Sequence, residues 1–134
     1  MNREFKRTRT SVDRFLKEVN DISFKKFPKY EAIEFSYKGV RYLLTSTGDL
    51  YQYTIAEVLQ LVHPYMKKYK NEPYLTITIA DNRSFYQKAR HSMQLKSLIW
   101  AAFGSEDVPP RGKILNKNGN YIACGIDNLK IEVI

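Results

Sequence analysis

The chain has 134 residues and carries 22 Lys and Arg against 14 Asp and Glu, a formal net charge of +8. This length suits one domain, and no apolar run approaches membrane-spanning length. The charged N-terminus lacks the apolar stretch of a signal peptide, and the single Cys124 fits a reducing cytoplasm. Net positive charge favours polyanions, so nucleic acid is the first candidate partner. Ordinary solubility charge and an acidic protein partner are the alternatives.

Much of the positive charge falls in residues 1–30, which hold nine Lys or Arg and four Asp or Glu. We expect a basic arm at the start, either lying along phosphates or forming a solvated tail, with Arg3, Lys6, Arg7 and Arg9. A helix capped by Thr10 or Ser11 should follow, because four apolar residues share one helical face: Val12, Phe15, Leu16 and Val19.

Alternating residues predict strands at 33–37, 41–45 and 50–53, with turns at Lys38-Gly39 and at 47–49. Thr54 and Glu57 then have the spacing of a capping box. The apolar residues that follow predict a helix that ends or kinks at His63-Pro64, with Ile55, Val58, Leu59, Val62 and Met66 on one face. A further hairpin is predicted from strands at 75–80 and 84–90 with a turn at 81–83.

The stretch from Leu95 to Asn120 is the most informative part of the sequence. Apolar residues spaced three and four apart predict a helix over 95–103, and Gly104 stands where a C-cap glycine belongs. Pro109 and Pro110 forbid its continuation. Asn118-Gly119-Asn120 between two extended runs predicts the turn of a short hairpin.

This order of motifs resembles the HNH homing-type endonucleases of phages and mobile elements. In that family a helix ending in an Ala-Phe-like pair leads through a Pro/Gly turn into a strand, an Asp/Asn-Gly-Asn turn and a later Asn-Leu pair. The matching positions here are Ala102-Phe103, Pro110, Gly112, Asn118-Gly119-Asn120 and Asn128-Leu129. Residues 42–53 resemble the small DNA-binding module that precedes HNH domains in such enzymes. The helix expected over 54–72 is an insertion in that pattern.

The resemblance places Leu115 and Asn116 at the positions of the catalytic Asp-His or His-His pair. Leucine cannot ligate a metal ion, and an asparagine amide has no useful basicity for activating water. The family's next helix completes the metal site, and we expect it to be missing because the sequence stops at Ile134. The resemblance therefore implies a degenerate endonuclease that is not an enzyme and holds no metal or cofactor. A nuclease with a rebuilt site is a less favoured alternative.

We expect an α+β fold of small antiparallel sheets or hairpins with about three helices, whose C-terminal part is a truncated version of the ββα-metal arrangement. It divides into a basic arm and helix (1–30), a small β module with a helical insertion (31–92) and a degenerate HNH-like part (93–134), packed as one globular unit.

The leading functional hypothesis is an inactive, HNH-like nucleic-acid-binding protein of phage or mobile-element origin in the cytoplasm of a bacterial host cell. It would hold duplex DNA by phosphate contacts, which position a protein without reading sequence. The candidate residues are Arg7, Arg9, Lys88, Arg90, Lys96, Arg111, Lys113 and Lys117. The alternative is a phage-type protein that binds and inhibits or regulates a host protein, for which the ten tyrosines and the arginines suit an interface. No membrane partner is expected.

Overall fold

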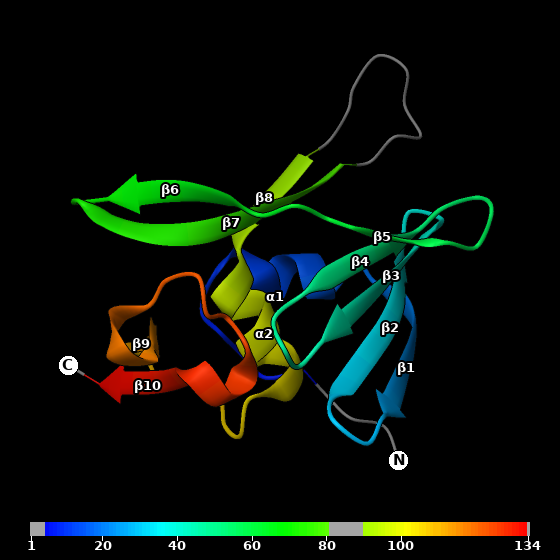
Figure 1. The fold of residues 1–134 in the computed structure, drawn as a ribbon. Coiled ribbons are helices and arrows are strands. Elements are labelled where there is room, and N and C mark those ends of the chain that lie inside the picture. Colours follow the sequence, from blue (N-terminus) through cyan, green and yellow to red (C-terminus); the bar gives the residue numbers. More distant parts are fainter. Residues whose placement is uncertain (1–4, 81–89, 134) are drawn as a thin grey trace.

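The computed structural model describes residues 5–80 and 90–133. In this part of the chain, ten strands form three antiparallel sheets that surround two short α-helices (Figure 1). The largest sheet has the order β1-β2-β3-β4-β5, with strands Asn20–Lys26, Glu31–Tyr37, Val40–Thr45, Leu50–Tyr53 and Leu59–Leu61. Successive strands are neighbours throughout this sheet, so it is a meander built by local turns.

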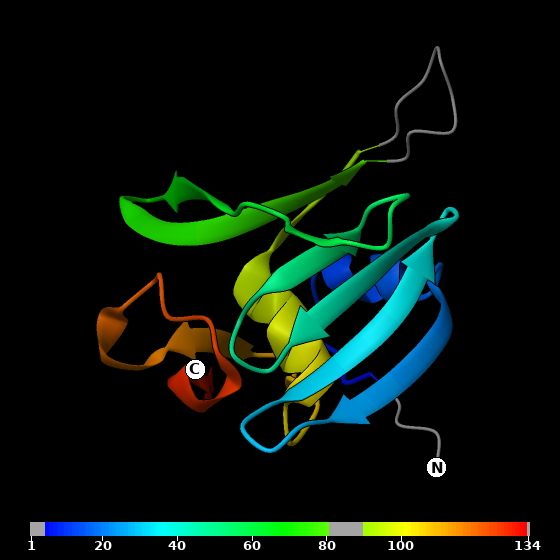
Figure 2. The ribbon, with the colours of Figure 1, turned by 45° about the vertical axis from the view of Figure 1, so that its right-hand side comes forward.

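The second sheet has the order β6-β7-β8, with strands Tyr65–Tyr69, Glu72–Ala80 and Arg90–Gln94. The third is the pair of β9 and β10, Gly112–Asn116 and Leu129–Val133, in which Asn116 lies opposite Leu129. The two 3-10 turns η1 and η2 lie between these strands, at Lys117–Gly119 and Ile126–Asn128. Helices α1 (Ser11–Leu16) and α2 (Leu95–Phe103) occupy the space between the sheets (Figure 2).

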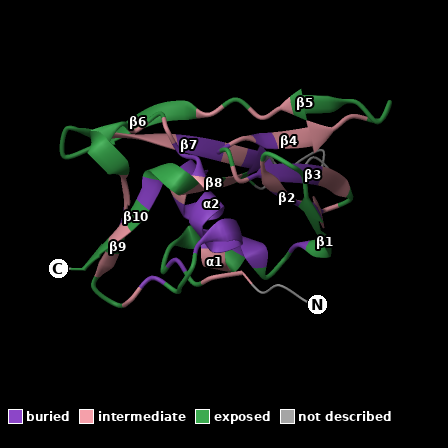
Figure 3. Cartoon of the chain, turned by 60° about the horizontal axis from the view of Figure 1, so that its bottom comes forward, coloured by how far each residue is buried: buried purple, intermediate pink, exposed green. Residues whose placement is uncertain are grey.

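Helix α2 is the centre of the hydrophobic core. Every residue of this helix except Lys96 is buried, so it is covered on all sides by the sheets and by α1. Figure 3 shows the buried residues gathered on the two helices and the middle of the sheets. From α1, Val12 and Phe15 reach this core, and the Phe15 ring packs 4.9 Å from the ring of Tyr37 on β2.

The strands predicted at 33–37, 41–45 and 50–53 are confirmed as β2, β3 and β4, and the helix predicted over 95–103 is confirmed as α2. Helix α1 begins where expected, with the Thr10 side chain accepting a hydrogen bond from the Val12 N–H. The strand predicted at 75–80 lies within β7. The turn at 81–83 and most of the return strand at 84–90, with Lys88, fall outside the described residues.

The predicted α+β fold with about three helices is wrong, because the described chain is mostly β. The largest error is the helix expected after Thr54, where the chain forms the turn of the β4–β5 hairpin and continues into β6. The Thr54 N–H donates to the Val58 carbonyl and the Val58 N–H donates to the Thr54 hydroxyl, which closes the turn. Glu57 has a φ of 62°, which no α-helix allows.

The tight hairpin expected at Asn118-Gly119-Asn120 is also wrong. These residues lie in and just after η1, and the connection between the paired strands β9 and β10 runs over residues 117–128. Asn118 and Gly119 do have the positive φ values, 58° and 68°, that make Asn-Gly a turn sequence. The backbone conformation of Asn118 and Gly119 was therefore predicted correctly. However, their turn lies within a longer loop and does not join β9 directly to β10.

Candidate nucleic-acid interface

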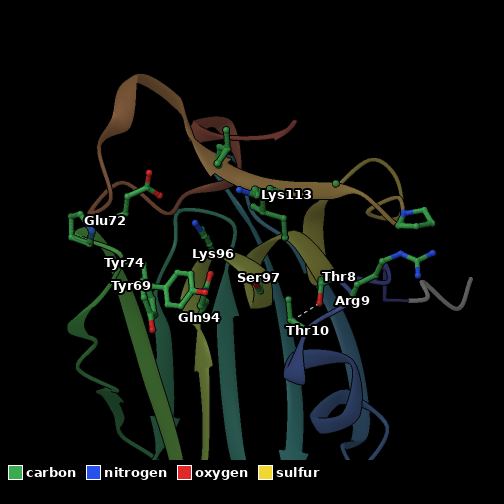
Figure 4. Close-up of a pocket in the computed structure, with 15 residues that line it drawn as sticks. Thr8, Arg9, Thr10, Tyr69, Glu72, Tyr74, Gln94, Lys96, Ser97 and Lys113 are labelled. Carbon is green, nitrogen blue, oxygen red and sulfur yellow. Dashed lines mark hydrogen bonds between the residues drawn. The ribbon is translucent and has the colours of Figure 1, made fainter. Parts of the chain in front are cut away.

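Three of the predicted basic residues, Arg9, Lys96 and Lys113, come from three separate segments to the wall of one cavity of about 590 Å³. We call it the α2 cavity, because the first turn of α2 forms its floor (Figure 4). Its wall is completed by the β6–β7 hairpin, by β9 and by the segment before α1, and contains Thr8, Thr10, Tyr69, Glu72, Pro73, Tyr74, Gln94, Ser97, Pro110, Gly112, Ile114 and Leu115.

A second cavity, of about 690 Å³, lies on the other side of Thr10, which lines both. Its wall contains Arg90, which was predicted, and two cations that were missed, Arg14 and Lys17. The signal that could have found them is the spacing of α1. Arg14 lies in α1 and Lys17 is its C-cap, so the two are three residues apart and both exposed, while Val12 and Phe15 are buried.

The other predicted phosphate contacts are not brought to these cavities. Arg7, Arg111 and Lys117 are exposed and line neither of them. Lys88 lies outside the described residues. The six cations that do line them form a set that we call the basic face: Arg9, Arg14, Lys17, Arg90, Lys96 and Lys113.

The segment before α1 is docked against the protein rather than extended as an arm. The Lys6 N–H donates to the Ala101 carbonyl of α2, and the Val108 N–H donates to the Arg7 carbonyl. The expectation of a free basic arm is therefore wrong for residues 5–9, whereas Arg3 lies outside the described residues. The apolar side chain that anchors this segment is Phe5, which packs against the core.

Arg9 is held in place at the edge of the α2 cavity. Its backbone has a φ of 59°, and its Nε donates to the Val108 carbonyl at 2.9 Å. The Asp13 carboxylate accepts hydrogen bonds from the Arg9 N–H and from both the N–H and the hydroxyl of Thr8. These bonds fix this wall of the cavity, while Asp13, which also lines the second cavity, keeps its negative charge and offsets part of the charge of the basic face.

Lys96 is the most unusual cation of the set. It is half-buried in the first turn of α2, and burial lowers the pKa of its ammonium group; nearby Lys113 adds to that effect, while Cys124 and Glu72 oppose it. Among the described residues, no hydrogen bond or ion pair reaches this ammonium group. The first turn of α2 contains no acidic residue and has no side-chain cap. A helix N-terminus attracts anions, so Lys96 adds its charge to an end that is already positive.

The wall of the α2 cavity that the second sheet forms, opposite Lys113 of β9, contains aromatic and polar side chains. Residues paired across antiparallel strands place their side chains on the same face. The pairs Tyr69–Glu72, Lys67–Tyr74 and Thr76–Gln94 therefore set one face of the second sheet toward this cavity. Gln94 makes no capping hydrogen bond with α2. Thr76, buried on this face, carries the one buried side-chain polar atom of the described residues that lacks a hydrogen-bond partner.

The two degenerate catalytic positions lie on β9. Leu115 is part of the wall of the α2 cavity. The Asn116 amide donates to the Ala123 carbonyl at 3.0 Å and points toward the Cys124 sulfur at 3.7 Å, so it holds the loop between β9 and β10. Burial raises the pKa of the Cys124 thiol. In residues 5–80 and 90–133, no three His, Cys, Asp or Glu side chains gather closely enough to hold a metal ion.

Comparison with known proteins gives no match, whether with protein-family models, with curated proteins or with solved structures. No helix in the described part of the chain is long and apolar enough to cross a membrane.

Proposed function

We propose that this protein binds nucleic acid through the basic face, with duplex DNA as the ligand. The observation that carries the proposal is the convergence of six cations, from the segment before α1, from α1 itself, from β8, from α2 and from β9, on two adjoining cavities. Such a surface neutralises phosphates, and this contribution supplies most of non-specific affinity for DNA. Within the wall of the α2 cavity, Glu72 is the only carboxylate among the lining residues that the structure describes.

The HNH-like, catalytically inactive character of the protein is part of the same proposal. It is supported by an antiparallel pair, β9 and β10, which carries Leu115 and Asn116 on its first strand and begins its second directly after Asn128. It is also supported by the contact between the two stretches that carry the family resemblance, because the Ile126 N–H donates to the Ser46 carbonyl. We propose a phage or mobile-element protein that acts on DNA in the cytoplasm of a bacterial host cell.

The proposal is tested by the salt dependence of duplex binding. On duplex DNA, log affinity against log salt changes by about −0.9 for each phosphate neutralised. The double variant Arg14→Gln/Lys17→Gln should therefore flatten the slope by up to about 1.8. The matched control Lys26→Gln/Lys29→Gln removes two exposed cations from β1 and the β1–β2 turn and should leave the slope unchanged. Absence of duplex binding at low salt, or equal slopes for the two variants, rejects the basic face as a DNA site.

The alternative, a protein that binds and regulates a host protein, is favoured by one specific surface. The β4–β5 turn and the strand after it expose apolar side chains that no part of the described chain covers, namely Ile55, Val58 and Leu59. A pull-down from bacterial lysate after nuclease treatment tests this reading. A host protein retained by the wild type and lost from Ile55→Asp, in the absence of duplex binding, would favour the alternative.

A further inference from the structure

We propose that the α2 cavity is a binding site for a single unpaired nucleotide, with its phosphate at Lys96 and Lys113 and its base against Tyr69 and Tyr74. This inference rests on the proposed function and makes it more specific. The volume of about 590 Å³ lies within the range of about 300 to 1,000 Å³ that is typical of ligand sites. A site built only for the backbone of a duplex would need exposed cations but no cavity.

The phosphate position follows from the charges on the floor and one wall. Figure 4 shows Lys96 rising from the start of α2 between the tyrosines of the β6–β7 hairpin and Lys113 of β9. Placing two ammonium groups near each other, one of them half-buried at a helix N-terminus, is unfavourable without an anion. The pKa of the Lys96 ammonium group is lowered chiefly by burial; Glu72 opposes this effect only in part, and Lys113 adds a smaller repulsion. A bound phosphate would offset the cost of burying this charge and would accept the hydrogen bonds that the ammonium group does not make within the described chain.

The base position follows from the aromatic wall. Tyr69 and Tyr74 come from the two strands of one hairpin, and the register places their side chains on the same sheet face. Every nucleobase has a π-face, so tyrosines in such a wall offer stacking without regard to sequence. Gln94, beside them, carries an amide that can both donate to and accept from a base edge, and its side chain does not cap α2.

The buried hydroxyl of Thr76 belongs to the sheet face that borders the α2 cavity, although Thr76 is not part of the cavity wall. It lies on the same face as Tyr74 and Gln94, and nearly all buried polar groups in proteins have a hydrogen-bond partner. One buried polar group on this face is therefore not satisfied by the described chain alone. A paired base inside a duplex cannot enter a cavity, so the nucleotide must be unpaired, as in an overhang, a gap or a flipped base.

The test compares a blunt duplex with the same duplex carrying a short single-stranded thymidine overhang. The overhang should raise the affinity of the wild type about tenfold, which corresponds to one stacked base and one held phosphate. Tyr74→Ala should abolish this gain while leaving the affinity for the blunt duplex nearly unchanged. Lys96→Gln should also reduce the gain. Tyr65→Ala is the matched control, because Tyr65 lies on the same sheet face but outside the α2 cavity wall.

Failure of the inference can be distinguished from failure of the proposed function. Equal affinity for the two duplexes, together with a steep salt dependence, overturns the nucleotide site and leaves the basic face intact. A gain from the overhang that persists in both Tyr74→Ala and Lys96→Gln also overturns it. If neither duplex binds at low salt, both the proposed function and the nucleotide site are rejected. Thermal unfolding of each variant checks that a lost gain does not reflect a lost fold.

Discussion

Gly48 packs its α-carbon against the backbone of Gly125 so closely that a Cβ on Gly48 would lie 2.7 Å from the Gly125 nitrogen. Gly48 also has a φ of 104°, which side chains rarely adopt. This contact joins the β3–β4 turn of the large sheet to the loop between β9 and β10. The two stretches that carry the resemblance to HNH proteins therefore pack together, although they are distant in sequence.

Gly48→Ala should lower the free energy of unfolding by more than about 2 kcal/mol. The positive φ alone costs roughly 1–2 kcal/mol with a Cβ, and the backbone of Gly125 cannot move aside as a flexible side chain could. Gly119→Ala is the control, because Gly119 has a φ of 68° but open space around it, so only the conformational cost of about 1 kcal/mol applies. Urea denaturation measures both, and equal losses would contradict the packing argument.

Glu34 makes the stability of the large sheet dependent on pH. Burial pushes its pKa up, but hydrogen bonds from Arg41 and Lys25 outweigh burial, so the pKa of this carboxyl lies below its ordinary value of 4.5. A lowered folded-state pKa adds stability that is fully present above the unfolded pKa and is lost as pH falls through the folded pKa. Glu34→Gln should therefore lower stability modestly at neutral pH and weaken its loss below about pH 4.5.

The measurement is thermal unfolding of the wild type and of Glu34→Gln at several pH values between neutral and acid. The control is Glu132→Gln, whose side chain is exposed on β10. If the wild type and Glu34→Gln lose stability in parallel on acidification, the ion pairs of Glu34 with Arg41 and Lys25, at 2.8 and 3.0 Å, contribute nothing measurable.

Removing residues 1–9 should destabilise the protein, against the expectation for a free arm. The deletion breaks the hydrogen bonds that join Lys6 to Ala101 and Arg7 to Val108, and it removes the bond from the Arg7 N–H to Asp107. The deletion also removes the hydrogen bonds of Thr8 and Arg9 to Asp13 and Val108, so at about 1 kcal/mol for each of the first three bonds alone the loss should be at least about 3 kcal/mol. Unchanged urea denaturation of the truncated protein would show that the docked segment contributes no stability. Its salt slope is interpretable only once its fold has been checked.

Sequence patterns correctly predicted those elements whose apolar residues, spaced for a strand or a helix, are also the residues buried in the core. The alternation that predicted β2 and β3 places Ile33, Phe35 and Leu44 in the core. Strand β1 was missed although Ile22 and Phe24 alternate with polar residues, because two apolar residues are too short a pattern; both side chains are exposed in the structure. The α2 cavity could not be predicted, because Lys96, Tyr74 and Arg9 meet only through the packing of separate elements.

The helix expected after Thr54 failed for a different physical reason. A short helix draws most of its stability from packing its apolar face, and here β4 offers backbone partners to β5 while no core surface is left for Ile55 or Val58. The β-branched residues in this stretch and Pro64 also favour an extended chain. Glu57 does not close a capping box with Thr54. Its carboxylate forms an ion pair with Arg41 on β3, at 2.9 Å.

Ile55→Asp tests that explanation directly. The Ile55 side chain is fully exposed at the β4–β5 turn, so the change should alter the free energy of unfolding by no more than about 0.5 kcal/mol. A buried helical isoleucine at this position would instead cost about 1.5–3 kcal/mol when replaced. Chemical denaturation distinguishes the two values. Val12→Asp, in the core face of α1, is the positive control and should unfold the protein.

The protein should not nick plasmid DNA in the presence of magnesium, manganese or zinc. A hydrolytic HNH site needs a group that accepts a proton from water beside a metal ligand. Leu115 offers no ligand atom, and Asn116 has no basic nitrogen and spends its amide N–H on the Ala123 carbonyl. The assay compares the wild type with Asn116→Ala, purified in the same way. Metal-dependent nicking that is lost in Asn116→Ala would show that β9 carries a working site, and nicking of equal rate that co-purifies with both proteins would indicate a rebuilt site elsewhere; either result would overturn the inactive assignment.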